Sequence, residues 1–231
     1  MASSGTYNFS PSNGEVVLAA YERIQIRVPE LRQEHMQTAR REINFLFSGL
    51  SNLQPNLWEV NLTSQALTQG TATYAVNPNV VMILDAYITL NQGQTNQTDR
   101  YITPISRTEY ASYATKQTQG FPTTFWFDRL ESPTFTLWPV PDSNGPYTMN
   151  YYVCTQMQDA NLPGGETPDV PYRWYDALVA GLSHRLARVY APSLEATRKA
   201  DAAEAWRIAA AQDTENVPVS LVPQLSVYYR V

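Results

Sequence analysis

The spacing of apolar residues changes twice along this chain of 231 residues, and that change limits the possible fold more than any other feature. Up to about residue 56, and again from residue 166, apolar residues recur every third or fourth position, which indicates amphipathic helices. Between residues 57 and 165 they alternate with polar residues, which indicates strands. Helical ends around a β-rich middle predict the α+β class.

Two helices are predicted before residue 57. Ser12 and Glu15 form a capping box at the start of the first helix, which we expect to continue to about Arg27. Pro29 suits the first turn of the second helix, because a missing amide costs nothing there. The apolar residues of this second helix have the three-four spacing typical of packing against another helix. They are Met36, Ala39, Ile43, Leu46, Leu50 and Leu53.

The middle of the chain predicts a sheet. Residues 80–90 begin with a run that is apolar on both faces, so we expect a central strand there. Residues 134–138 and 147–154 are expected to form a hairpin around the turn at residues 142–145. Ser106 is expected to cap a short helix. The buried face of the first strand is expected to carry Trp58, Val60 and Leu62.

One apolar stripe runs along a predicted helix near the end of the chain. Its residues are Trp174, Leu178, Leu182, Leu186 and Tyr190. The helix must end before Pro192, and we expect Ser193 to cap the next one. We therefore predict an α+β fold in which the two chain ends form a helical bundle, with a β-rich insertion and an extended C-terminal tail.

Four segments follow from this interpretation. The first is an N-terminal helical pair (residues 1–56), and the second is the β-rich insertion (residues 57–165). The third is a C-terminal helical pair (residues 166–213) that packs on the first, and the last is an extended tail (residues 214–231).

The composition favours contacts with other proteins. The net charge is −5, which argues against a clamp for nucleic acid. Only 16% of residues are charged, and an uncharged polar and aromatic surface is easier to desolvate against a partner subunit. No apolar stretch approaches the roughly 18 residues of a membrane span, so no membrane partner is expected. With one cysteine and no signal peptide at the N-terminus, we expect a reducing cytosol as the site of synthesis.

No group of residues predicts catalysis. His35, His184 and Cys154 are too few for a tetrahedral zinc site without carboxylates, and no phosphate-binding loop is present. We expect Cys154 to be a partly buried strand thiol. Catalytic, cofactor and metal residues are therefore predicted to be absent, and no cofactor is expected. A carboxylate-dependent hydrolase stays open as an alternative, because it needs only two acidic residues across a cleft.

Several segments together carry a resemblance to a known family. They are a Pro-x-Pro-Asp step at residues 139–142, an aromatic strand at residues 147–152, the helix start at residues 174–182, and earlier matches at residues 106–110 and 120–122. In this order they resemble the head-to-tail adaptors of tailed bacteriophages, which are similar to podovirus adaptor and tail tubular proteins. The likeness covers most of the chain.

The resemblance implies a structural protein of the virion, made in the host bacterial cytoplasm and located at the head-tail interface. It implies a homo-oligomeric ring of about twelve subunits under the portal, extending the DNA channel to the tail. The implied partners are the portal protein and the tail or nozzle proteins, and packaged DNA passes without sequence-specific binding. A tail-tube or nozzle component and a virion-associated cell-wall hydrolase are the alternatives.

The end of the chain is the predicted partner-binding segment. A short β-prone stretch after Pro218 and Pro223 cannot complete a strand pair by itself, although a disordered end is the alternative. The resemblance implies docking of such extensions on the portal or on a neighbouring subunit. The basic cluster of Arg185, Arg188, Arg198 and Lys199 is either a solvated face or a site for an acidic partner. The candidate partner-binding residues are Leu225, Val227, Tyr228, Tyr229, Arg230, Arg185 and Arg188.

Overall fold

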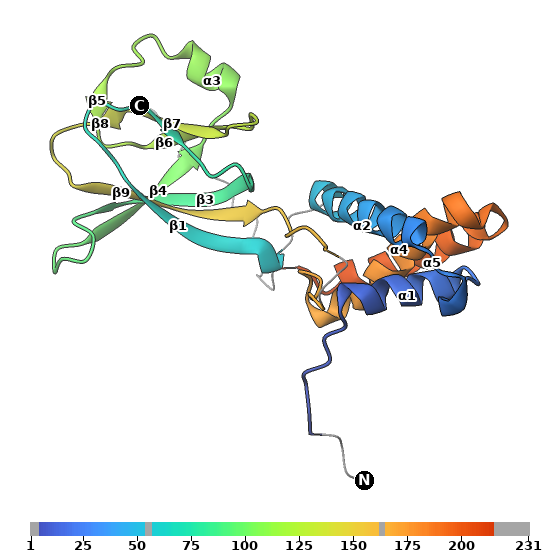
Figure 1. Ribbon diagram of the computed structural model, residues 1–231. Coiled ribbons are helices and arrows are strands. Elements are labelled where there is room, and N and C mark those ends of the chain that lie inside the picture. Colours follow the sequence, from blue (N-terminus) through green and yellow to red (C-terminus); the bar gives the residue numbers. More distant parts are fainter. Residues whose placement is uncertain (1–4, 54–56, 162–164, 215–231) are drawn as a thin grey trace.

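The computed structural model describes residues 5–53, 57–161 and 165–214, and it consists of a helical part and a β part that lie side by side (Figure 1). The α-helices are α1 (Asn13–Arg23), α2 (Gln33–Leu53), α3 (Arg107–Ser112), α4 (Tyr175–Tyr190) and α5 (Glu195–Ala210). Single turns of 3-10 helix are η1 (Val28–Glu30), η2 (Leu57–Glu59), η3 (Tyr172–Trp174) and η4 (Pro192–Leu194). Among the described residues, no helix combines the length and the apolar character that a membrane span requires.

The β part is a curled sheet of seven strands. The strands are β1 (Val60–Ala66), β2 (Thr73–Ala75), β3 (Val80–Leu90), β4 (Thr98–Pro104), β6 (Thr124–Asp128), β7 (Thr134–Trp138) and β9 (Tyr147–Thr155). Their order is β1-β9-β3-β4-β6-β7-β2, and all neighbours are antiparallel except β4 and β6. The short strands β5 (Gln119–Gly120) and β8 (Val140–Pro141) pair separately. The prediction of a central strand at β3 is confirmed.

The sheet has its own hydrophobic core on its concave side. Alternate residues of β9, β3 and β4 point into it, among them Met149, Ile88 and Ile102. Phe125 of β6 and Phe135 of β7 close the core from the other end of the sheet. These side chains are almost completely buried, so this core adds to the β4–β6 pairing that joins the two halves of the sheet.

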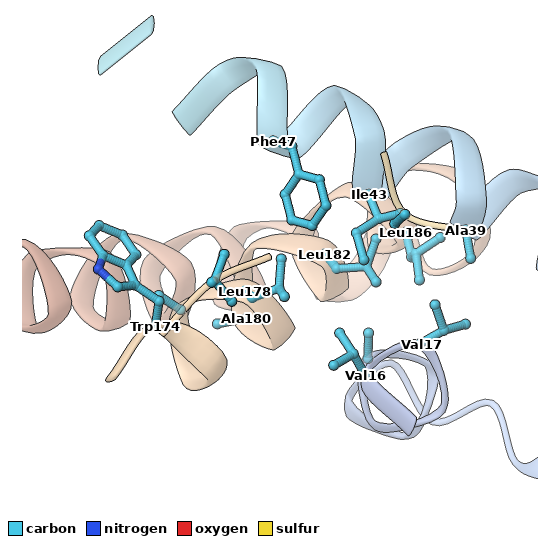
Figure 2. Packing of buried hydrophobic residues seen from close by; sticks show 14 of the residues in the cluster. Val16, Val17, Ala39, Ile43, Phe47, Trp174, Leu178, Ala180, Leu182 and Leu186 are labelled. Atoms are coloured by element: carbon cyan, nitrogen blue, oxygen red, sulfur yellow. The ribbon is translucent and has the colours of Figure 1, made fainter. Parts of the chain in front are cut away.

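Helix α4 is the centre of the helical part. Helices α1, α2 and α5 each pack on it (Figure 1). Figure 2 shows the buried side chains of α1 and α2, such as Val17 and Ile43, pointing toward the leucines of α4. The predicted stripe is confirmed, because Trp174, Leu178 and Leu182 are buried. Leu186 is buried as well, and Tyr190 packs at the edge of the core.

The expected helical bundle of the two chain ends was wrong. The fold is α+β, but its largest unit is the curled seven-stranded sheet, and the helices do not form two pairs that pack on each other. The reason is that α4 buries residues over most of its circumference, including Ala177, Ala180 and Ser183 besides its leucine stripe. Such a helix accepts several neighbours, whereas α1 and α2 each bury one face against it.

The first two helices begin and end at different residues than expected. The capping box is confirmed, since the Ser12 hydroxyl accepts from the Glu15 amide at 3.2 Å and the Glu15 carboxylate accepts from the Ser12 amide at 2.7 Å. Helix α1 ends at Arg23, because Gln25 has a left-handed backbone with φ of 67°. Pro29 lies in η1, and α2 begins only at Gln33.

The apolar face of α2 is rotated from the expected seam. The buried residues are Ala39, Ile43, Phe47 and Leu50. Leu53 is exposed and Leu46 lies at the edge of the core, so Phe47 takes the place that the prediction gave to Leu46. A four-four-three spacing follows the true helical period more closely than the expected three-four alternation.

The expected hairpin around residues 142–145 was also wrong. Strand β7 pairs with β6 and β2, whereas β9 pairs with β1 and β3. Between them the chain leaves the sheet through β8, which pairs with β5.

Two further local predictions fail, since Leu62 is exposed and no side chain of Ser193 caps α5. The cap at Ser106 is confirmed by its bond from the Glu109 amide at 3.1 Å.

Candidate functional site

The described residues contain no group of three His, Cys, Asp or Glu side chains that could hold a metal ion. His184 bonds Glu195 at 3.0 Å and so joins α4 to α5. His35 accepts a hydrogen bond from the Arg32 amide, and its ring lies 4.8 Å from that of Tyr190. Both histidines therefore hold helices together. Cys154 lies on β9 as expected, but it is buried rather than partly buried.

A buried carboxyl group lies where the β part meets the helical part. Burial raises the pKa of Glu59 to about 7, the hydrogen bond from Thr155 acts in the opposite direction, and the nearby carboxylate of Asp169 raises it further. The Thr155 hydroxyl donates to Glu59 Oε2 at 3.0 Å. Trp58 donates to the Asp169 carbonyl at 3.2 Å, and its ring lies 5.2 Å from that of Trp174. The pKa of Glu59 therefore depends on the contact between the β part and the helical part.

A polar cleft of about 450 Å³ opens beside this contact. Its lining includes Asn13, Asp159, Glu166 and Asp169. Because the carboxylates do not converge as metal ligands in the described part of the chain, the cleft has no preformed cation site. The Asn13 amide nitrogen donates to the Asn161 carbonyl at 3.3 Å, which ties α1 to the segment after β9.

Of the two predicted arginines, Arg185 is used within the subunit. Its guanidinium lies 3.7 Å from the Glu42 carboxylate of α2 and donates to the Phe45 carbonyl at 3.3 Å. Arg188, one turn further along α4, is exposed. The five predicted residues of the tail, Leu225, Val227, Tyr228, Tyr229 and Arg230, lie outside the described residues. The partner-binding role of all seven residues stays a prediction.

The rim of the α2–α4 contact combines exposed apolar and basic side chains. Phe45 of α2 and Val189 of α4 are each 53% exposed. The Arg41 side chain is 60% exposed, and Arg188 is exposed as well. We call these four residues, Arg41, Phe45, Arg188 and Val189, the helical rim. The Arg185–Phe45 contact joins the two helices here, Arg41 lies one turn from Phe45 on α2, and Arg188 with Val189 lies one turn from Arg185 on α4.

The convex face of the sheet is the second exposed surface. Leu62 of β1 lies opposite Tyr152 of β9, and Tyr87 of β3 lies opposite Tyr101 of β4. Leu62, Tyr152 and Tyr101 are 49%, 41% and 62% exposed. We call the row of Leu62, Asp85, Tyr87, Asp99, Tyr101 and Tyr152 the outer face. In the described part of the chain, α1, α2, α4 and α5 make no extensive contact with these strands.

An N-terminal arm, residues 5–11, extends from α1 away from the rest of the molecule (Figure 1). The Phe9 ring meets the Tyr175 ring edge-on at 6.2 Å, and the hydroxyl groups of Ser10 and Tyr175 are 3.4 Å apart. Tyr7 and Tyr172 are largely exposed beside them. The arm therefore forms a third exposed aromatic surface.

The sequence prediction missed the outer face and the arm. The outer face has a visible signal, since Asp85, Tyr87 and Thr89 alternate with the buried Ala86 and Ile88. This signal was missed because the same strand begins with a run of residues that is apolar on both faces. The arm has no such signal, because Tyr7 and Phe9 lie in a short polar segment in which apolar residues do not recur at a regular spacing.

Comparison with known protein families gives a match over most of the chain. The family model described as SU10 adaptor protein matches residues 19–221 of the chain, which covers both the helical part and the β part. This match agrees with the resemblance to phage head-to-tail adaptors that the motifs carry. No curated protein matches the chain.

Proposed function

The chain belongs to the SU10 adaptor protein family, and from this membership we propose that it is a head-to-tail adaptor of a tailed bacteriophage. It is a structural component of the virion that joins the capsid vertex to the tail. The family match over residues 19–221 is the observation that carries this proposal. A structural role also suits a sequence that has only two histidines and one cysteine.

The adaptor acts as a ring of about twelve copies that lies under the portal and continues its DNA channel. Each copy contacts two neighbours, the portal on one side and tail or nozzle proteins on the other. Such a position requires several separate contact surfaces on one subunit. The outer face, the helical rim and the N-terminal arm support the proposal, because they are three exposed surfaces on different elements.

Packaged DNA passes through the ring without sequence-specific binding. Residues 57–165 hold four basic and eight acidic residues. An acidic wall repels phosphate groups, which lets DNA of any sequence slide. The net charge of −5 for the whole subunit supports the same interpretation.

The C-terminal tail anchors the adaptor. Leu225 and Val227 alternate with polar residues, so an extended tail can add a strand to a partner while one face stays apolar. The portal or a neighbouring subunit is the partner. Arg188 contributes a basic contact at the surface of α4.

Localisation in the particle tests the proposal. Antibody fragments raised against the folded subunit are bound to purified virions and observed by electron microscopy. We expect one band of label at the junction of head and tail. Label along or at the tip of the tail would instead indicate a tail-tube or nozzle component and contradict the adaptor role.

Two further measurements accompany the localisation. Phage with a nonsense mutation in this gene should yield DNA-filled heads without tails, and the wild-type gene supplied in trans should restore tailed particles. Zymography on peptidoglycan tests the hydrolase alternative, and we expect no clearing. Tailed particles without this protein would contradict the proposal.

A further inference from the structure

The outer face is built as a rigid surface. A chain of side-chain hydrogen bonds crosses four strands on this side of the sheet. Ser64 donates to Asn150 across β1 and β9, Asn150 donates to Thr89 at 2.7 Å, and Thr89 donates to Asp99 at 2.7 Å. Thr89 and Asn150 are 1% and 4% exposed. A surface that is already ordered loses little conformational entropy when a partner binds.

The exposed side chains of this face suit a protein partner. Tyrosines bury much area at low entropy cost and are enriched at interfaces, and here three of them share this face with Leu62, which lies opposite Tyr152. They lie on adjacent strands, with Tyr87 opposite Tyr101 and Tyr152 in the neighbouring strand. Single exposed apolar residues are ordinary, but aromatic residues gathered on neighbouring strands are typical of an interaction site.

The charge of the outer face is negative. Asp85 and Asp99 are exposed on it, and the Tyr101 hydroxyl donates to Asp85 at 3.4 Å. Arg100, the basic residue of β4, belongs to the opposite side of the sheet, where it lies 5.0 Å from the Phe121 ring. The described strands β1, β3 and β9 contain no lysine or arginine. A partner of the outer face should therefore be basic and partly apolar.

The helical rim has that complementary chemistry. Arg41 and Arg188 are exposed on the same two helices as Phe45 and Val189, with Arg41 3.8 Å from the Glu42 carboxylate. Arginine stacks on tyrosine rings and pairs with carboxylates, and the two apolar side chains match Leu62 and the ring faces. The rim and the outer face belong to the two different parts of the molecule (Figure 1). One subunit can therefore present each surface to a different neighbour.

We propose that the outer face of one subunit binds the helical rim of a second copy of this chain, so that these two surfaces form the contact between ring neighbours. The inference rests on the ring of the proposed function and names its interface. A contact between two different patches is head-to-tail, and repeated contacts of this kind close into a ring. The rigid sheet face provides one half of the contact, and Arg188 with Val189 provides the other.

Crosslinking in assembled particles tests the interface. A full-length Tyr101→Cys/Val189→Cys variant is supplied in trans to phage that lack the gene, and purified particles are treated with a short bis-maleimide. We expect a ladder of covalent multimers of this chain on a denaturing gel. The native Cys154 is buried and should not react. A Leu130→Cys/Val189→Cys variant is the matched control, since Leu130 is exposed in the turn between β6 and β7, and it should give no ladder.

Charge exchange provides an independent measurement. Asp85→Arg and Arg188→Glu each place like charges across the contact and should reduce incorporation into particles by roughly tenfold. Both changes in one chain should restore most of the incorporation. Thermal melts of each free variant check that the subunit still folds.

Three results would overturn this interface. One is incorporation of the cysteine variant without a ladder, and another is a crosslink from Tyr101→Cys to the portal or to a tail protein. The third is a folded double charge variant that incorporates no better than either single variant. In the first two cases the variant is in the particle, and in the third the wild-type protein still is, so the proposed function stands. Absence of the wild-type protein from particles would instead contradict the proposed function.

Discussion

Trp174 is the largest completely buried side chain of the helical part. It lies at the start of α4, where it contacts Trp58 of the β part at a ring distance of 5.2 Å. One side chain therefore serves both the helical core and its contact with the sheet. Its loss should affect the stability of the whole subunit.

We expect Trp174→Ala to lower the free energy of unfolding by about 3–5 kcal/mol, the usual cost of deleting a large buried aromatic side chain. Chemical denaturation of the purified subunit measures the change. Tyr172→Ala is the matched control, because Tyr172 lies in the same 3-10 turn but is largely exposed. It should change stability by less than about 0.5 kcal/mol. Equal midpoints for wild type and Trp174→Ala would show that the burial is energetically unimportant.

Glu59 should make stability depend on pH. Its carboxyl has an ordinary pKa of 4.5, raised to about 7 in the folded subunit chiefly by burial. Below pH 4.5 both folded and unfolded chains carry the proton, so the contribution of this group is complete there. Between these two pKa values only the folded chain holds the proton, so stability falls as pH rises toward 7. The loss is complete above the folded pKa.

Glu59→Gln should remove this part of the pH dependence, because an amide does not titrate. The measurement is the melting temperature of wild type and variant between pH 4.5 and 8. We expect the wild-type curve to fall more steeply than that of the variant. Glu204→Gln on the exposed side of α5 is the control and should keep the wild-type slope. Parallel curves for wild type and Glu59→Gln would contradict the raised pKa.

At the scale of elements, α2 packs tightly on α4 at Gly181. A β-carbon added at Gly181 would lie 3.1 Å from both δ-carbons of Leu46. Glycine therefore lets the two helices meet, although it costs about 1 kcal/mol of helix propensity relative to alanine. At this position the contact with Leu46 favours glycine over alanine, although alanine is the better helix former.

A double-mutant cycle tests this balance. In a Leu46→Ala background, Gly181→Ala should stabilise the subunit by about 1 kcal/mol, because the propensity gain is no longer opposed by a steric contact. In the wild-type background the same change should gain less or destabilise. Urea denaturation of the four proteins gives the coupling free energy. A Gly181→Ala effect that is the same in both backgrounds would mean that Leu46 does not restrict this position.

The C-terminal tail is the element whose removal should separate folding from assembly. We expect deletion of the residues after Asp213 to leave the melting temperature unchanged, because both hydrophobic cores lie upstream. The truncated subunit should fail to join portal-bearing capsids, since the proposed anchor is gone. Electrophoresis of purified capsids after incubation with the subunit measures incorporation, with the full-length chain as control. Normal incorporation of the truncated subunit would leave the tail without a docking role.

Most elements, but not their partners, could be predicted from the sequence. The stripe from Trp174 to Leu186 and the position of β7 depend on local spacing and nearby proline, so they were predictable. The pairing of β7 with β2 and of β9 with β1 joins segments that are distant in the sequence, such as Thr73 with Thr136, and no local pattern specifies it. The arrangement of α1, α2 and α5 around α4 is likewise a long-range result.

The candidate surfaces were less predictable than the elements. Arg188 was selected from a basic cluster and is exposed, but nothing in the spacing distinguished it from Arg185, which bonds Phe45 within the subunit. Exposure depends on which helix covers which face, and that is known only from the fold. The division into four segments stays a prediction.

The whole molecule should be independent of metal ions. The described residues hold no cluster of three metal-binding side chains, and the sequence has two histidines and one cysteine. We expect dialysis against a chelator to leave both the melting temperature and ring assembly unchanged. Elemental analysis of the purified protein measures bound metal directly. About one zinc ion per chain would contradict this expectation.

The central position of α4 also affects how the chain is made. Helices α1 and α2 leave the ribosome first, but the helix that covers their apolar faces follows about 120 residues later, on the order of 10 s at bacterial synthesis rates. During this interval the whole sheet emerges and can close its own core. Residues such as Val17 and Ile43 remain without their native partner on the nascent chain. The order of synthesis thus makes the first two helices targets for a ribosome-associated chaperone until α4 appears.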